Sequence, residues 1–403
     1  MENTLNLKRI WNGTAALFLT LYIFCGHFRY PFSSTLFLYV CFAMTVISLL
    51  SKPTFKLSAN LLWFFLIVLI SFIGLIYTDN LSTAKRQVIF FSVYLVLFAY
   101  FIQNDDFLKE IKKTISLFAV LGTFSVFIQF IFTNHFNHLI KMVFRADVYK
   151  NVMFANDVDN TFSGLTSSVS MASFSMAIVF FDSVKRIINR LLKDNEDKKE
   201  GSIPLLFNIA TALISLFGII LTSKRGIFIA TVFSLIITIF LDKDISLKKL
   251  KPKHILLSFT LFFIVLIILF FLLRNNEFVL AFINRFKGGD ITTGRGSIYS
   301  KAINELKYKG VLTYLFGNGT GSAVLINETG LHNVYLQIFY DHGLVGTILY
   351  LGFFIINLKT AVKNRFFYSM SMQIVFLVYC MSGNPLYDYY FFIPYLIFVN
   401  IKK

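Results

Sequence analysis

Residues 203–241 read "IPLLFNIATALISLFGIILTSKRGIFIATVFSLIITIFL", an apolar run of 39 residues that is interrupted only at 222–226. A helix that crosses a bilayer needs about 20 apolar residues, so this run is long enough for two such helices. The polar residues in its middle predict a turn. The run therefore predicts a transmembrane helical hairpin with Lys224 and Arg225 at its tip.

The rest of the chain has the same apolar character. Of its 403 residues, 56% are hydrophobic and 15% are charged, whereas soluble domains carry about 25% charged residues. The first apolar run leads directly into further ones, so we expect a membrane anchor there rather than a cleaved signal. The pattern predicts an all-α polytopic membrane protein, one membrane domain over 1–403, with about 12 spans at 10–28, 32–50, 59–77, 86–102, 113–133, 166–182, 203–222, 226–241, 254–273, 333–358, 368–382 and 386–400.

The distribution of Lys and Arg predicts the orientation of these spans. With a cytoplasmic amino terminus, 23 basic residues face the cytoplasm and 15 face the outer side, and seven of those 15 lie in the single long loop 274–332. Basic residues favour cytoplasmic loops and long loops largely escape that rule, so we expect both termini in the cytoplasm. Loops that face anionic lipid then explain the net charge of +17, and the sequence has no nucleic-acid-binding pattern.

Two loops on the predicted outer side are long. The first, 134–165, mixes charged and aromatic residues, which is typical of a segment that lies at the membrane interface. In the second, 274–332, apolar residues recur with helical spacing over 297–308. The glycine-rich stretch 317–321 that follows predicts irregular backbone.

Candidate metal ligands are sparse. The three cysteines lie far apart in apolar runs, with neither metal-ligand spacing nor a disulfide framework, so we expect small buried residues. Asp157 and Asp159 form an Asp-x-Asp pair, a spacing that occurs at some divalent-cation sites. Ordinary surface acidity is the simpler interpretation of one isolated pair, so we expect no metal.

Polar side chains that suit an anionic ligand gather on the outer side. Lys224 and Arg225 break the preference for basic residues inside, and they either snorkel to the interface or form an anion site near the membrane surface. Arg295 lies in the second long loop, and His332 with Asn333 stands at the start of the tenth span. Each of these positions has an ordinary interpretation alone, but their order along the chain indicates a shared site.

In this order the motifs resemble those of the O-antigen polymerases and O-antigen ligases of bacterial envelopes, over about 160–360. One pattern consists of His-Asn, then nine residues, then Gly-x-x-Gly. It resembles the signature that follows the family's large periplasmic loop. "SKRG" resembles a Ser-Arg-Gly element with Lys224 where serine is usual, and "GRGSIY" resembles a Gly-Arg element with Tyr299 in place of tryptophan. The matching residues are Arg225, Gly226, Arg295, His332, Asn333, Gly343 and Gly346, and the family's glycine-rich piece is "FGNGTG".

The resemblance implies a GT-C-like glycosyltransferase of the bacterial inner membrane with its active site on the periplasmic face. Such enzymes move a glycan from undecaprenyl diphosphate to a sugar hydroxyl, with inversion at the anomeric carbon. Arg225 and Arg295 would hold the leaving diphosphate, since guanidinium groups pair with phosphates through charge-assisted hydrogen bonds. His332 would take the proton of the attacking hydroxyl, and Asn333 would orient the imidazole or the acceptor.

Lys224, Tyr299 and Arg145 complete the expected substrate contacts. The family often has an arginine ahead of the glycine in the loop before the sixth span, where this chain has Asn160 and Ser163. Arg145 is the candidate to replace that arginine. Because arginines can neutralise the phosphates, we expect neither a metal nor another cofactor.

Three further polar residues lie in the last spans. Asp341 and His342 would lie about 14 Å deeper along the helix than His332, so we expect them to affect packing or line a cavity. Asp388 stands near the outer end of the last span, where it could face the same cavity.

The motifs leave the acceptor open. A polymerase uses another lipid-linked repeat unit and a ligase uses the lipid A core. The stretch 330–354 resembles polymerases more closely, so we expect a polymerase. A lipid-linked oligosaccharide flippase is a third interpretation, but it predicts a two-half repeat and charges inside several spans, which the sequence lacks. The expected partners are lipid-linked repeat units, membrane lipids and a chain-length regulator protein.

Overall fold

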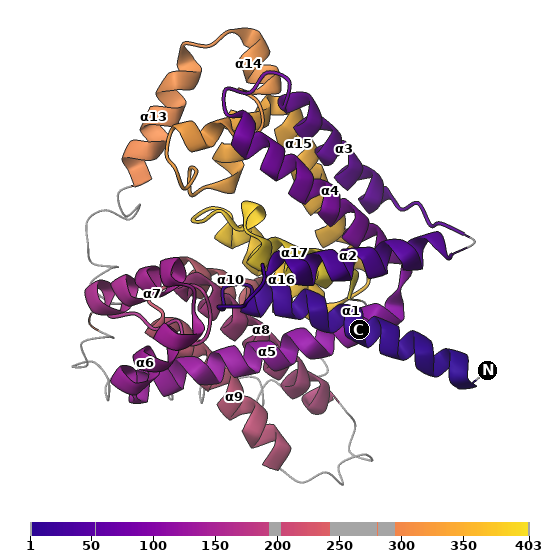
Figure 1. Ribbon diagram of the computed structural model, residues 1–403, viewed down its shortest axis with the longest axis vertical. Coiled ribbons are helices and arrows are strands. Elements are labelled where there is room, and N and C mark those ends of the chain that lie inside the picture. Colours follow the sequence, from indigo (N-terminus) through magenta and orange to yellow (C-terminus); the bar gives the residue numbers. More distant parts are fainter. Residues whose placement is uncertain (1, 53, 193–202, 242–279, 281–294, 402–403) are drawn as a thin grey trace.

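The computed structural model describes residues 2–52, 54–192, 203–241, 280 and 295–401, and every regular element within these ranges is a helix (Figure 1). The predicted all-α class is therefore confirmed. The elements are α1 (Glu2–Cys25), α2 (Thr35–Leu50), α3 (Ala59–Gly74), α4 (Leu81–Gln103), α5 (Asp105–Ile131), α6 (Thr133–Val143), α7 (Ala146–Asp159), α8 (Val169–Leu192), α9 (Ile203–Leu221), α10 (Arg225–Leu241), α13 (Arg295–Lys307), α14 (Val311–Phe316), η3 (Ser322–Leu325), α15 (Val334–Lys363), α16 (Phe367–Tyr379), η4 (Pro385–Tyr387) and α17 (Tyr389–Asn400).

The helices follow the hydropathy pattern. Each expected span coincides with a helix except 254–273, which lies outside the described residues. α4, α5, α15 and the part of α9 from Pro204 to Leu221 are long and apolar enough to cross a membrane, while α2, α3, α10, α16 and α17 are apolar but shorter. The chain is a multi-pass membrane protein. The number of 12 spans and the GT-C-like arrangement remain predictions.

The last helices form the centre of the molecule (Figure 1). α17 contacts α1, α4, α5, α8, α15 and α16, and its residues 391–398 are all buried. Aromatic rings fill the space between these helices: Phe376 stacks on Tyr395 with ring centroids 4.3 Å apart, and Phe64 stacks on Phe353 at 5.3 Å. A helix that is apolar on every side is buried on every side, which explains how helices this short are stabilised.

The apolar run 203–241 folds as two helices with a turn between them. α9 ends at Leu221, α10 begins at Arg225, and Ser223 in the turn adopts a left-handed conformation with φ +52°. The two helices do not pack mainly on each other: α9 lies against α8, and α10 lies against α16. The turn therefore sits between two parts of the bundle.

The segment 134–165, which the sequence predicts on the outer side, contains α7 and nearly all of α6, and the two helices share a small core. Its buried members are Phe136, Ile140, Phe144, Val148 and Val152. A chain of buried amides ties these helices to α5: Gln129 Nε2 donates to Asn137 Oδ1 at 2.9 Å, and Asn137 Nδ2 donates to Asn156 Oδ1 at 3.0 Å. The segment expected at the interface is thus an ordered helical pair.

α15 is broken at Gly343, where φ is +62° and ψ is −159°. The glycine-rich loop after α14 passes at this break, so that a Cβ on residue 343 would collide with the backbone of Leu315. The loop satisfies the carbonyls that the break frees: Asn318 N–H donates to Tyr340 O and Gly319 N–H donates to Asp341 O, each at 2.9 Å. At this glycine of the Gly-x-x-Gly motif, α15 therefore packs closely against the segment 315–317.

Candidate active site

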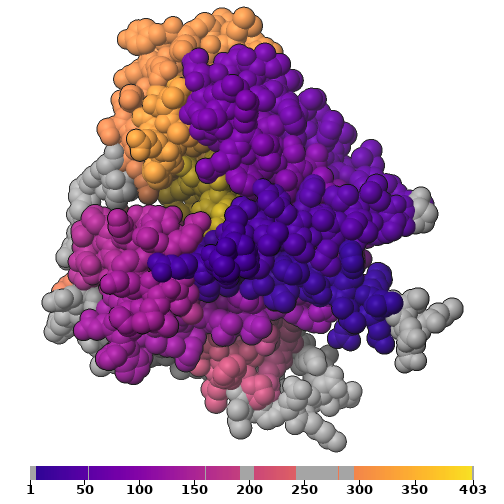
Figure 2. Space-filling model, in the orientation of Figure 1, coloured from indigo at the N-terminus to yellow at the C-terminus, as the bar shows by residue number. Residues whose placement is uncertain are grey.

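A cavity of about 820 Å³ opens among the ends of several helices. Its walls come from the start of α4, the start of α8, the α9–α10 turn, α13 and the loops before α15 and α17. The charge distribution predicts that all of these segments face the outer side. Figure 2 shows a hollow near the centre of the visible face, where atoms of the C-terminal segment lie between the orange, purple and magenta surfaces.

Arg295 is the first residue of α13, and its guanidinium reaches the loop after α16. Nη1 donates a hydrogen bond to the backbone carbonyl of Ser382 at 2.6 Å. Gly226, the second residue of α10, lies against the same serine, and a Cβ on residue 226 would collide with Ser382 Oγ. The start of α10 and the start of α13 therefore meet at Ser382. The close approach of Ser382 explains why the last residue of "SKRG" is a glycine.

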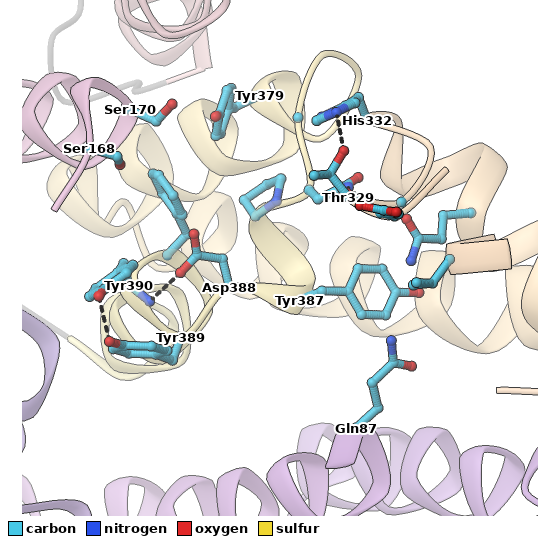
Figure 3. Close-up of a pocket in the computed structure, with 18 of the residues that line it drawn as sticks. Gln87, Ser168, Ser170, Thr329, His332, Tyr379, Tyr387, Asp388, Tyr389 and Tyr390 are labelled. Atoms are coloured by element: carbon cyan, nitrogen blue, oxygen red, sulfur yellow. Dashed lines mark hydrogen bonds between the residues drawn. The ribbon is translucent and has the colours of Figure 1, made fainter. Parts of the chain in front are cut away.

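His332 lies in the loop before α15, with a left-handed backbone conformation at φ +53°. Its Nε2 is 2.9 Å from Thr329 Oγ1 (Figure 3). Its carbonyl accepts a hydrogen bond from the Tyr299 hydroxyl at 3.3 Å. From the other side, Asn384 Nδ2 donates to the carbonyl of Thr329 at 2.6 Å. These contacts hold the imidazole in a defined position on the cavity wall.

The surroundings of His332 keep its imidazole neutral. Partial burial disfavours the charged imidazolium and lowers the pKa of His332 below its ordinary value. The positive charges of Arg295 and Lys224 lower this pKa further. A neutral imidazole at neutral pH can accept a proton, which is what a general base must do.

The two basic residues of the α9–α10 turn lie differently. Lys224 lines the cavity, as Arg295 and His332 do. Arg225 is half-buried at the start of α10 and, within the described part of the chain, does not belong to the cavity lining. The structure therefore brings three of the expected site residues together and leaves Arg225 beside them.

Asn333 and Tyr299 support the site without lining it, as far as the described residues show. Asn333 is the N-cap of α15, where its Oδ1 accepts a hydrogen bond from Leu336 N–H at 3.1 Å. Tyr299 lies one turn after Arg295 on α13, so both residues are on the same helix face. Its hydroxyl is bonded to the carbonyl of His332. Both residues hold the His332 loop in place.

A comparison with protein families identifies this region. Residues 210–351 match the family model described as O-antigen ligase. This segment, which carries Lys224, Arg295 and His332, is similar to the O-antigen ligase family. The matched residues include Lys224, Arg295 and His332, so the resemblance inferred from the motifs is confirmed. No curated protein sequence matches the chain.

Arg145 lies outside the O-antigen ligase family match and outside the cavity lining of the described residues. Its Nε is 3.8 Å from Asp147 Oδ1, and the two side chains are 50% and 71% exposed. Such exposed pairs contribute little to stability. The main-chain N–H of Arg145 donates to the carbonyl of His27 at 3.2 Å, beside the bridge between Phe28 and Phe144. Among the described residues the expected third guanidinium therefore does not line the cavity, although its charge acts on Tyr390 in the cavity wall.

A different arginine lines the cavity, also outside the O-antigen ligase family match. Arg86 and Gln87, near the start of α4, both belong to the lining, and Figure 3 shows Gln87 on the opposite edge of the cavity from His332. One feature of the sequence indicates this wall of the cavity. Lys85 and Arg86 flank the predicted outer end of the fourth span, where the preference for basic residues inside disfavours them.

The loop before α17 contributes the remaining polar wall. Asp388 lines the cavity, as its position in the sequence indicated, and its Oδ1 accepts a hydrogen bond from Tyr390 N–H at 3.0 Å. The hydroxyls of Tyr389 and Tyr390 are bonded to each other (Figure 3). Hydroxyl, amide and carboxylate groups can donate to and accept from the hydroxyls of a sugar.

Asp341 and His342 are fully buried and, among the described residues, lie outside the cavity lining. Asp341 Oδ1 accepts a hydrogen bond from Ala323 N–H at 2.8 Å, which fixes η3 to α15. The His342 ring stacks on Tyr350 with centroids 5.9 Å apart. The expectation that these residues affect packing, rather than touch the acceptor, agrees with their positions.

Other candidate ligands lie away from the cavity. Cys25, Cys41 and Cys380 are buried and free, as expected of small core residues. Asp157 is exposed on α7 and does not belong to the cavity lining. Within the described ranges, no three His, Cys, Asp or Glu residues form a group that could hold a metal ion.

Proposed function

We propose that this protein transfers a glycan from a polyprenyl diphosphate carrier to a sugar hydroxyl. The observation that carries the proposal is the convergence of His332, Arg295 and Lys224 on one cavity. These residues meet the two chemical needs of such a transfer, a base for the hydroxyl and cations for the leaving diphosphate. The O-antigen ligase family match over 210–351 supports the same class of reaction.

In the proposed step, the acceptor hydroxyl oxygen attacks the anomeric carbon of the donor sugar while the bond from that carbon to the diphosphate oxygen breaks. The hydroxyl proton passes to the neutral imidazole of His332. The bonding electrons leave with the diphosphate, and Arg295 and Lys224 stabilise the negative charge that develops on it. Direct displacement inverts the anomeric configuration, and side chains supply the positive charge without a metal ion.

We propose that the reaction takes place on the periplasmic face of a bacterial inner membrane, with both termini in the cytoplasm. The cavity lies at helix ends, and the diphosphate of a membrane-embedded carrier would reach helix ends at the level of the lipid headgroups. A flippase needs its binding site near the middle of the membrane, between two alternately opening halves. The position of the cavity therefore favours an enzyme over a flippase.

We propose a polymerase, in which the acceptor is another undecaprenyl-diphosphate-linked repeat unit and a chain-length regulator protein is a partner. The stretch 330–354 favours this choice. The second candidate is a ligase that transfers the glycan to the lipid A core. The description of the matching family, O-antigen ligase, favours that candidate.

The test is glycan transfer by the purified full-length protein in EDTA. The donor is a defined undecaprenyl-diphosphate-linked repeat unit, offered alone or with lipid A core. A ladder of longer lipid-linked glycans from the donor alone supports the polymerase. Glycan found only on the lipid A core supports the ligase. No transfer to either acceptor overturns the proposed function, and transfer that appears only when a divalent metal is restored overturns the metal-independent step.

A further inference from the structure

The wall of the cavity formed by α4 carries a cation that the proposed reaction does not use. Arg86 lines the cavity together with Ser82, Thr83, Gln87 and Phe90. These residues lie within the first ten of α4, far in sequence from the segment with His332 and Arg295. A guanidinium among hydroxyl and amide groups is a typical surface for an anionic or sugar ligand.

The guanidinium of Arg86 has little else to hold it. Its Cζ lies 6.0 Å from the centre of the Phe90 ring. Among the described residues it has no hydrogen bond and no ion pair, in contrast to Arg295, which donates to Ser382 O. Arg86 is exposed and lines the cavity, so its five donors are available to a ligand there.

Arg86 and the transfer centre lie on different walls. Figure 3 shows Gln87, the neighbour of Arg86 on α4, across the cavity from His332 and Thr329. The cations that act on His332 are Arg295 and Lys224. A cavity of about 820 Å³ is as large as sites that enclose whole drug-sized ligands, so it can hold more than the reacting groups.

We propose that Arg86 binds an anionic group of the acceptor substrate, separate from the diphosphate that leaves in the reaction. This inference rests on the proposed function, because an acceptor exists only for a transferase. Two sources share the required chemistry: the diphosphate of a lipid-linked acceptor and the carboxylate of an acidic sugar. Arg86 pairs with either through charge-assisted hydrogen bonds.

The simpler alternative is that Arg86 only snorkels to the lipid headgroups, as basic residues at span ends do. Lys85 provides the matched control, because it is the adjacent basic residue on α4, is exposed, and is absent from the cavity lining of the described residues. A role at the membrane surface predicts similar effects for both residues. A role in the cavity predicts an effect for Arg86 alone.

The experiment measures binding and transfer with wild type, Arg86→Gln and Lys85→Gln in lipid nanodiscs. The probes are one repeat unit linked to a short-chain prenyl diphosphate, the same glycan as a neutral alkyl glycoside, and an alkyl glycoside that contains a uronic acid. Binding is measured by calorimetry without donor, and transfer is measured as KM for each acceptor at saturating long-chain donor.

We expect Arg86→Gln to weaken binding of an anionic acceptor about tenfold, the loss of roughly one charge-assisted hydrogen bond, and to raise its KM similarly with little change in kcat. Lys85→Gln and the neutral glycoside should show no change. An effect confined to the prenyl diphosphate identifies a phosphate, and one confined to the uronic acid identifies a carboxylate.

If wild type and Arg86→Gln bind every probe equally, the inference is overturned. The proposed function still stands in that case, provided that wild type transfers glycan. An equal effect of Lys85→Gln also overturns it, in favour of the membrane surface. If Arg86→Gln weakens anion binding but wild type transfers glycan to no acceptor, the anion site stands and both the proposed function and the acceptor assignment fail.

Discussion

The hydroxyl oxygen of Thr329 lies 2.9 Å from Nε2 of His332. Asn327 Nδ2 donates a hydrogen bond to the same hydroxyl oxygen at 2.8 Å. Asn327 thus fixes the hydroxyl that is the hydrogen-bond partner of the imidazole. Thr329 is therefore a positioning residue that holds the His332 ring in one orientation.

Thr329→Val should lower kcat of the proposed transfer about fivefold, because it removes one hydrogen bond worth roughly 1 kcal/mol and frees the imidazole to rotate. Valine has nearly the shape of threonine, so the fold should be retained. Thr329→Ser keeps the hydroxyl and should keep most of the activity. Steady-state kinetics of both variants checks this, and a Thr329→Ser enzyme as slow as Thr329→Val would contradict the role of the hydroxyl.

The pH dependence should report the charges around His332. The base must be neutral, so the rate rises as pH passes upward through the pKa of His332 and then stays constant. Because burial, Arg295 and Lys224 lower this pKa from 6.5, the acid limb should lie at lower pH than an ordinary histidine would give. Arg295→Gln or Lys224→Gln removes a positive charge, raises the pKa of His332 and should move the acid limb to higher pH.

The measurement is the rate at saturating substrate from acidic to neutral pH. Only the position of the acid limb is compared, since Arg295→Gln also lowers the plateau. Arg145→Gln is the control, because Arg145 lies outside the cavity lining of the described residues and has no part in the lowering of the His332 pKa. A limb that moves to lower pH in Lys224→Gln would show that His332 is not the titrating base.

Gly343→Ala should destabilise the protein by roughly 1–3 kcal/mol, because the backbone conformation at this residue is one that essentially only glycine adopts. The collision of its Cβ with the backbone of Leu315 adds to this cost. Gly13→Ala is the matched control: Gly13 lies inside α1 with open space around it, so alanine should stabilise by about 1 kcal/mol. Thermal unfolding in detergent compares them, and equal melting temperatures would contradict the break in α15.

Gly226→Ala should lower activity by displacing Ser382, whose carbonyl holds Arg295. Ser382→Ala keeps that carbonyl and removes the Oγ with which the new methyl group would collide, so alone it should be nearly neutral. The double variant should then recover much of the activity lost in Gly226→Ala, because the effects of substitutions at two residues in direct contact are not additive. The measurement is a double-mutant cycle of the transfer rates of wild type, the two single variants and the double variant. Additive losses would mean that Gly226 acts through another contact.

The helices could be predicted because their apolar runs are long. The break at 222–226, the helix expected at 297–308 and the irregular backbone at 317–321 all correspond to observed elements. Asn333 was expected beside the substrate, yet an asparagine directly before an apolar run also predicts an N-cap. That local signal gave the correct structural role.

The far wall of the cavity could not be predicted in the same way. Arg86 and His332 are separated by most of the chain, and their shared cavity depends on how α4 packs beside α15 and α17. Hydropathy predicts that a segment spans the membrane but not which helices it contacts. Arg145 was the candidate to replace an arginine of the family that the motifs resemble. The sequence signal for the wall formed by α4 is the unusual position of Lys85 and Arg86 at the predicted outer end of a span.

The most direct test of the central claim measures glycan transfer by wild type, His332→Gln, Arg295→Gln and Arg145→Gln, with thermal unfolding as the check on folding. If the cavity is the transfer centre, His332→Gln and Arg295→Gln should each lose roughly a hundredfold in rate, while Arg145→Gln stays close to wild type. Folded His332→Gln protein that transfers glycan at the wild-type rate would contradict the account.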